Sequence, residues 1–176
     1  MFRKSERNCA RAILVAALLT ATSAPTLGDA LGDCNEAARP TARIAGCTTI
    51  IEAGPGQDVL AVALMNRGIG RAAEGDLDAA LTDFDAALEA APGMLEGYYN
   101  RGNVNLDLGR NEDAVRDFSV VIEAEPGFAL AWLNRGLARE QAGDREAAKR
   151  DIRKALALNK SLDAARRALA RLDREN

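Results

Sequence analysis

The central and C-terminal parts of this chain repeat with a period of 34 residues. The tripeptide Asn-Arg-Gly begins at Asn66, Asn100 and Asn134, and another glycine follows each copy at a constant distance. These later glycines are Gly75, Gly109 and Gly143. A fixed period of this length indicates stacked copies of one small unit, each covering the apolar face of its neighbour, and it therefore predicts a solenoid.

Other positions recur when residues 61–94, 95–128 and 129–162 are aligned. Each window carries two large and two small or β-branched apolar positions in the same order, and the first two windows close with a proline. These residues are Leu64, Tyr98 and Trp132, then Ala80, Ala114 and Ala148, then Phe84, Phe118 and Ile152, then Ala87, Val121 and Ala155, with Pro92 and Pro126. The pattern resembles the tetratricopeptide repeat, which implies an all-α fold: a right-handed α-solenoid of helix-turn-helix repeats in those three windows.

The recurrent glycines suit such packing. Gly68, Gly102 and Gly136 fall in the middle of predicted helices, where glycine costs about 1 kcal/mol relative to alanine. This cost is tolerated where two helices approach so closely that a side chain would separate them, and the recurrent alanines are expected on the facing helix. The later glycine of each unit is predicted to end the first helix in a left-handed conformation.

Two positions depart from the family pattern, and the departures recur. Arginine stands where the family usually has a large apolar residue, and mostly arginine stands where it often has tyrosine. These residues are Arg67, Arg101 and Arg135 at the first position, and Arg71, Asn105 and Arg139 at the second. Because Asp83, Asp117 and Asp151 share the period, we expect each first-position arginine to pair with an aspartate, across its own hairpin or in the neighbouring repeat. The alternative is a solvated charge that was duplicated with the unit.

Residues 1–30 are predicted to be a signal peptide. Four basic residues precede an apolar run that begins at Ile13 and is shorter than the roughly 20 residues of a membrane span. Cleavage after Ala30 is the first choice and cleavage after Ala24 the second. We therefore expect an exported bacterial protein, periplasmic or secreted, without stable membrane insertion after cleavage. An organelle-targeting peptide or an uncleaved anchor is the alternative.

Signal removal would leave two cysteines, Cys34 and Cys47. An even pair in an exported chain favours a disulfide, and two free buried thiols are the alternative. The segment 43–55 resembles the second helix of a repeat, with Cys47 in the place of Phe84. Residues 31–60 are therefore predicted to be a degenerate half-repeat that caps the N-terminal end, and residues 163–176 a helix that caps the other end.

The composition argues against catalysis. The chain has no histidine, so it lacks the commonest general base and the commonest metal ligand. It also has no phosphate-binding loop and no metal-ligand spacing. We expect no enzyme activity, no cofactor and no metal.

Charge is distributed unevenly along the chain. Residues 61–128 hold 13 acidic and 5 basic side chains, whereas residues 129–176 hold 7 acidic and 12 basic ones. The acidic body argues against nucleic-acid binding. The asymmetry suggests an alternative function, a structural homo-oligomer in which the basic end of one molecule docks on the acidic middle of the next.

The resemblance also implies a binding groove on the first helix of each pair. Transferring the family's groove positions gives Asn66, Ile69, Glu96, Tyr99, Asn100, Asn103, Asp107, Leu133, Asn134, Leu137 and Gln141. Because none of these is basic, an acidic C-terminal peptide is expected to bind poorly, and a ligand with apolar and basic groups to bind better. The recurrent asparagines can bond a peptide backbone, or alternatively be satisfied within their own helix pairs. The predicted function is a non-catalytic scaffold or adaptor for a protein or peptide in the cell envelope.

Overall fold

The computed structural model describes residues 26–36 and 38–174, and all regular secondary structure in that part of the chain is α-helical. The helices are α1 (Leu27–Glu36), α2 (Pro40–Glu52), α3 (Gln57–Ala73), α4 (Leu77–Ala90), α5 (Leu95–Asp107), α6 (Asn111–Ala124), α7 (Ala129–Gln141), α8 (Arg145–Leu158) and α9 (Asp163–Arg174). The basic start and the apolar run of the predicted signal peptide lie outside the described residues.

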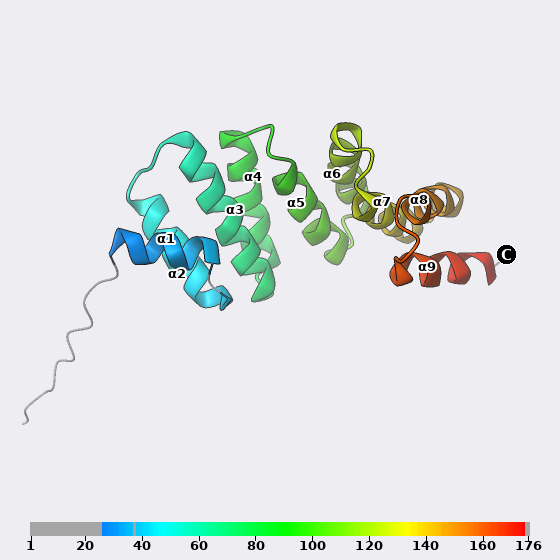
Figure 1. Ribbon diagram of the computed structural model, residues 1–176, viewed down its shortest axis with the longest axis horizontal. Coiled ribbons are helices and arrows are strands. Elements are labelled where there is room, and N and C mark those ends of the chain that lie inside the picture. Colours follow the sequence, from blue (N-terminus) through cyan, green and yellow to red (C-terminus); the bar gives the residue numbers. More distant parts are fainter. Residues whose placement is uncertain (1–25, 37, 175–176) are drawn as a thin grey trace, which may run out of the picture.

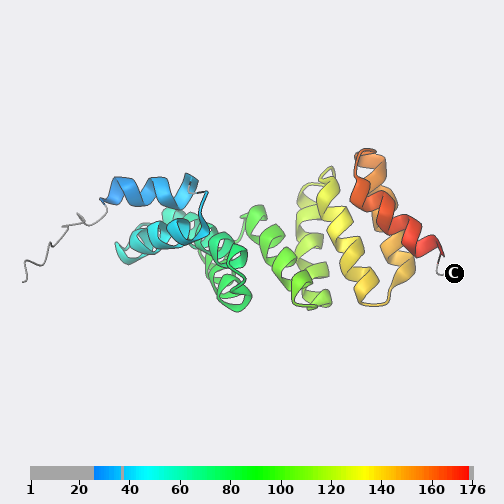
Figure 2. The same ribbon diagram turned by 90° about the horizontal axis from the view of Figure 1, so that it is seen from below.

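The helices form successive antiparallel hairpins that follow one another along the long axis of the molecule (Figure 1). We call α1, α3, α5 and α7 the first helices and α2, α4, α6 and α8 the second helices. Helices α3 and α4 stand upright in Figure 1, whereas α7 and α8 are seen closer to end-on, so the hairpins turn about the axis (Figure 2). The predicted all-α solenoid is confirmed.

Each first helix also contacts the next first helix, α1 with α3, α3 with α5 and α5 with α7. No corresponding contacts between successive second helices reach the same extent in the described part of the chain. The first helices therefore form a continuous surface, which we call the first-helix face. The predicted groove positions all belong to helices of this face.

The ends of the helices follow the predicted chemistry. Gly75, Gly109 and Gly143 have φ angles of 85°, 71° and 87°, the left-handed conformation that glycine adopts without a steric penalty. Asp76 and Asp144 then cap α4 and α8, because their side chains accept hydrogen bonds from backbone N–H groups of the first turn.

The mid-helix glycines mark the places where the two helices of a hairpin approach most closely. A Cβ atom at Gly68 or Gly102 would lie 2.7 or 2.9 Å from the ring of Phe84 or Phe118. At Gly136 it would lie 2.8 Å from Ile152 and 3.2 Å from the carbonyl oxygen of Ala148. The close approach is as predicted, but in the first two repeats the glycine makes room for the large ring rather than for the facing alanine.

Residues 27–52 form a complete two-helix hairpin, which differs from the half-repeat expected over residues 31–60. Its close approach is built with glycine on the other helix: a Cβ atom at Gly46 of α2 would lie 2.6 Å from the carbonyl oxygen of Ala30 and 2.8 Å from the amide nitrogen of Cys34. The sulfur atoms of Cys34 and Cys47 are 2.12 Å apart, as in a disulfide. Both cysteines are fully buried between α1, α2 and α3.

The location of Ala30 bears on the expected cleavage site. Ala30 lies inside α1, is 1% exposed and packs against Cys34, Cys47 and Ile50. Cleavage after Ala30 would remove the first turn of α1 and part of this small core. Cleavage after Ala24, the second choice, would leave the helix whole.

At the other end of the array, α9 covers the last repeat. Its buried residues Ala165, Ala168 and Leu172 pack into one apolar cluster with Ile152 and Ala155 of α8. The guanidinium of Arg145 donates to the carbonyl oxygen of Leu172 at 2.7 Å. The apolar face that α8 would otherwise expose to water is thereby closed.

Candidate functional site

The three recurrent arginines and the three recurrent aspartates form bidentate ion pairs within each hairpin. In every repeat Nε and Nη2 of the arginine donate to the two carboxylate oxygens of the aspartate sixteen positions later. The pairs are Arg67–Asp83 at 3.0 and 2.7 Å, Arg101–Asp117 at 3.1 and 2.7 Å, and Arg135–Asp151 at 2.8 and 3.0 Å. The aspartates are 2–4% exposed, so the predicted pairing is confirmed and the solvated alternative is wrong.

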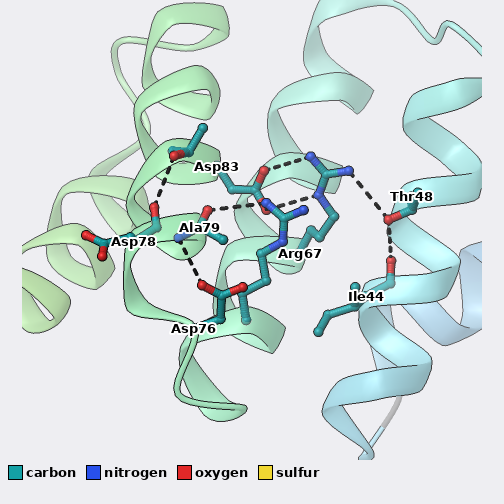
Figure 3. A network of polar contacts seen from close by, with 9 residues as sticks. Ile44, Thr48, Arg67, Asp76, Asp78, Ala79 and Asp83 are labelled. Atoms are coloured by element: carbon teal, nitrogen blue, oxygen red, sulfur yellow. Dashed lines mark hydrogen bonds and ion pairs between the residues drawn. The ribbon is translucent and has the colours of Figure 1, made fainter.

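Each arginine also reaches back to the preceding hairpin through Nη1. Arg67 donates to the Thr48 hydroxyl at 3.4 Å, so that it lies between α4 and α2 (Figure 3). The corresponding bonds join Arg101 to Asp85 at 2.6 Å and Arg135 to Ser119 at 3.0 Å. The predicted aspartate pairing therefore occurs within the hairpin, and the bonds to the preceding hairpin go to Thr48, Asp85 and Ser119 and not to a recurrent aspartate. We call this series the arginine ladder.

Aromatic rings and the second departure from the family pattern complete the ladder. The guanidinium carbons of Arg101 and Arg135 lie 5.5 and 4.8 Å from the ring centres of Tyr98 and Trp132, within cation–π range. Hydrogen bonds to Asp117 are the main cause that raises the pKa of Arg101 above its ordinary value. Of the second-position residues, Asn105 and Arg139 donate hydrogen bonds to the aspartate of their own hairpin, and Arg71 forms an ion pair with its aspartate.

On the first-helix face, two of the three predicted asparagines are bonded to the neighbouring hairpin. Asn66 donates to Asn35 at 3.0 Å. Asn134 donates to the amide oxygen of Asn103 at 2.8 Å and to the hydroxyl of Tyr99 at 3.2 Å. Asn100 makes no side-chain hydrogen bond with any residue in the described part of the chain. The predicted row of free amides is therefore reduced to Asn100, and the satisfied amides bond between hairpins rather than within them.

Tyr99 and Asn100 line a cavity of about 290 Å³ on this face. The remaining wall consists of Leu95 and Glu96 of α5, Val121 and Glu125, and Phe128. The Tyr99 ring packs against Phe118 and Phe128, with ring centres 5.9 and 5.0 Å away. Burial raises the pKa of Tyr99 above 10.0, and hydrogen bonds with Asn103 and Asn134 act in the opposite direction.

The other predicted groove residues fall into three groups. Glu96, Asp107 and Gln141 are exposed on the first helices. Ile69 and Leu137 are only partly exposed, because each packs on an apolar cluster of its own repeat. Leu133 corrects the prediction: it is 4% exposed and packs in the cluster that α9 closes, so it presents almost no surface to a ligand.

A second cavity, of about 320 Å³, lies between α1 and α3 and was not predicted. Leu31, Val59 and Val62 border it with 43%, 47% and 41% of their surfaces exposed. Asn35, Asp58 and Ala63 complete most of the rim. One sequence signal could have indicated it: Val59 and Val62 are apolar residues three apart on either side of residue 61, where the first repeat begins. The prediction of a cap over residues 31–60 excludes that segment from the binding face.

Two kinds of site are not found in the described residues. No group of histidine, cysteine, aspartate or glutamate side chains there has the arrangement of a metal site. Nor is any described helix both long and apolar enough to cross a membrane.

Comparisons with known proteins agree with this architecture. Residues 65–127 and 99–149 match the family model described as "Tetratricopeptide repeat". A double mutant of MamA RS-1 superposes with a TM-score of 0.77 at 22% identity, over 85% of this chain and 82% of that one. The Arabidopsis OM64 TPR domain gives 0.66 at 23% identity, over 69% and 100%. The second TPR domain of human RPAP3, in complex with the HSP70 peptide SGPTIEEVD, gives 0.64 at 24% identity, over 67% and 98%. No curated protein matches the sequence.

Proposed function

Because this chain belongs to the tetratricopeptide repeat family, we propose that it is a non-catalytic scaffold whose first-helix face binds a protein or peptide. The observation that carries the proposal is the pair of cavities on this face. One, between α1 and α3, is bordered mainly by exposed apolar side chains, and the other combines the Tyr99 and Phe128 rings with the unbonded amide of Asn100. Together they offer anchors for apolar side chains and a hydrogen-bonding group for a peptide backbone.

The charges around the cavities indicate the ligand's chemistry. Asp58 borders the first cavity, Glu96 and Glu125 border the second, and neither is lined by lysine or arginine. The HSP70 peptide bound by human RPAP3 ends in Glu-Glu-Val-Asp. Here a peptide of that kind would bring its carboxylates beside those of the protein. We propose instead a ligand that carries apolar anchors and basic residues.

The experiment is a binding comparison between two fluorescent peptide sets of equal length, one apolar and basic, the other apolar and acidic. We expect the basic set to bind, and Asn100→Ala and Val62→Lys to weaken its binding by about tenfold each, which corresponds to about 1.4 kcal/mol. Lysine at position 62 removes an apolar anchor and repels a basic ligand. Glu89→Ala, an exposed change on the second helix α4, is the matched control and should leave binding unchanged. Tighter binding of the acidic set, or equal binding by all variants, would refute the proposal.

We also propose that the protein works outside the cytoplasm of a bacterium, in the cell envelope. The basic and apolar start of the sequence and the cysteine pair of the first hairpin support this. Cleavage after Ala24 would leave Pro25 at the start and α1 intact. The test of export is the intact mass of the protein recovered from the periplasm or the medium, which should be that of the chain without its signal peptide. A full-length chain found in the cytoplasm would contradict the proposal.

Self-association is a second candidate, favoured by the basic surface of α8 and α9. The exposed basic residues of α8 and α9 include Arg150, Lys154 and Arg167. Helices α3 to α6 together carry more acidic than basic side chains. Head-to-tail docking of these regions would be weakened by salt. Light scattering at low and high salt distinguishes the two functions, because a scaffold for another protein would keep its monomer mass at both.

A further inference from the structure

The middle repeat differs from its neighbours at one position of the arginine ladder. Asp83 and Asp151 each receive two guanidinium groups, the second from Arg71 at 3.0 Å or Arg139 at 2.7 Å. Asp117 receives one, from Arg101, and its other partner is the amide of Asn105 at 3.2 Å. The middle repeat therefore has no second cation beside Asp117, whereas each flanking repeat provides one with its own arginine.

A cavity occupies the space beside the shorter side chain. It has a volume of about 320 Å³ and lies between the second helices α4 and α6, with part of α5 between them. Apart from Leu81, its lining is polar and consists of Asp85, Arg101, Asn105, Arg110, Asp113, Arg116 and Asp117. It is therefore separate from both cavities of the first-helix face.

The cavity presents hydrogen-bond acceptors that are not fully used. Asn105 is 6% exposed, and its Nδ2 donates to Asp117 while its Oδ1 accepts no hydrogen bond from any described residue. The three lining arginines, by contrast, are all engaged: Arg101 with Asp85 and Asp117, Arg110 with Asp78 and Arg116 with Asp113. An entering anion would have to compete with these carboxylates, whereas a cation with several N–H groups would find Oδ1 of Asn105 without a partner and the carboxylate of Asp117 without a second cation.

The first repeat shows how such a cation is held. Nη1 of Arg71 contacts Oδ2 of Asp83 at 3.0 Å and donates to the carbonyl oxygen of Ala79 at 3.3 Å. One period later the corresponding acceptors are the carbonyl oxygen of Asp113 and Oδ2 of Asp117, which accepts from Nε of Arg101 and from the neutral amide of Asn105 instead of a second guanidinium. A planar guanidinium matches this set, since it offers five donors in a fixed geometry.

We propose that the cavity beside Asn105 binds a guanidinium group from another molecule, which takes the place that Arg71 and Arg139 occupy in their own repeats. The group comes from an arginine side chain of a partner polypeptide or from a small guanidino compound. In both cases the middle repeat is a recognition site on the second helices, and the inference does not depend on the proposed function of the first-helix face.

The experiment titrates N-acetyl-arginine amide into the full chain and follows the side-chain amide signals of Asn105 by NMR. We expect saturable shifts, with affinity about tenfold above that of the citrulline analogue, which has the same shape without the charge. A peptide that carries one arginine distinguishes the sources, because tighter binding than that of the amide assigns the group to a polypeptide. Equal binding of the citrulline analogue, or tighter binding of inorganic phosphate, would overturn the proposal.

Two variants give independent readouts. Asn105→Arg supplies the missing guanidinium from within, so binding should be lost and the unfolding temperature should rise. Arg139→Asn opens the corresponding space in the third repeat, so N-acetyl-arginine amide should raise the unfolding temperature of this variant more than that of the wild type. If Asn105→Arg folds and still binds the amide as the wild type does, or if the amide gives Arg139→Asn no added stabilisation, the site is not the one proposed.

Discussion

Nε and Nη2 of Arg135 donate to the two carboxylate oxygens of Asp151 at 2.8 and 3.0 Å, and Arg139 donates to the same carboxylate at 2.7 Å. Asp151 is 3% exposed. One buried carboxylate therefore pairs with two guanidinium groups and joins α7 to α8, while Nη1 of Arg135 joins α7 to Ser119 of the preceding hairpin. The ladder joins helices within a repeat and repeats to one another.

Removing this carboxylate should be costly. Asp151→Ala leaves two guanidinium groups facing each other without their shared partner, and we expect it to lower the free energy of unfolding by about 2–4 kcal/mol. Asp85→Ala removes a partner of Arg101 whose side chain is 58% exposed, so its effect should stay below about 1 kcal/mol. Urea unfolding of both variants compares the two. Equal urea midpoints for the two variants would contradict a stabilising role for the buried arginine–aspartate pairs.

The predictability of the ladder from sequence depended on repetition of residue type. Arginine and aspartate recur with identical spacing, so their pairing could be predicted before any coordinates. The partners between hairpins are the hydroxyls of Thr48 and Ser119 and the carboxylate of Asp85, which do not recur as one residue type. They became apparent only when the stacking of the hairpins was known.

The candidate site was less predictable, because it depends on what packs over each position. Leu133 occupies a groove position of the family but is covered in the cluster that α9 closes. The side-chain amides of Asn66 and Asn134 donate hydrogen bonds to Asn35 and Asn103, which lie nearby because the hairpins contact one another. The apolar cavity at Val62 arises because α1 extends the first-helix face beyond the first recognisable repeat.

The effect of replacing a helical glycine by alanine should depend on the space around its Cβ position. In Gly136→Ala the new Cβ would lie 2.8 Å from Ile152, so overpacking should outweigh the gain in helix propensity and destabilise the protein by about 1–3 kcal/mol. Gly32 in α1 has no atom within 4 Å of its Cβ position, so Gly32→Ala should stabilise the chain by about 0.5–1 kcal/mol. Thermal unfolding measures both. A stabilised Gly136→Ala would show that the two helices can separate freely.

The disulfide should stabilise the N-terminal hairpin more than the rest of the array. Closing a loop with 13 residues of sequence separation contributes about 3 kcal/mol in the chain-entropy model. Because repeat arrays transmit stability mainly between neighbours, the Cys34→Ala, Cys47→Ala double variant should lose amide protection first in α1 and α2, and little in α7 to α9. Hydrogen exchange resolves these regions. Uniform loss along the chain would indicate that the whole array unfolds as one unit.

Tyr99 gives the structure a pH-dependent contribution with a definite sign. Its pKa is raised above 10.0, mainly by burial, so the folded chain keeps the phenolic proton at pH values where the unfolded chain has lost it. The stabilisation is fully present below about pH 10 and is lost as the pH rises through the folded-state pKa.

Ultraviolet titration should therefore show a tyrosine that ionises above the ordinary range, and Tyr99→Phe should abolish that component while keeping the ring that packs on Phe118 and Phe128. Tyr98→Phe is the matched control, since it removes the neighbouring phenol and leaves the Asn134–Tyr99 contact in place. If the late component disappears in Tyr98→Phe and persists in Tyr99→Phe, the packing described around Tyr99 is wrong. That result would also remove the aromatic wall of the proposed peptide cavity.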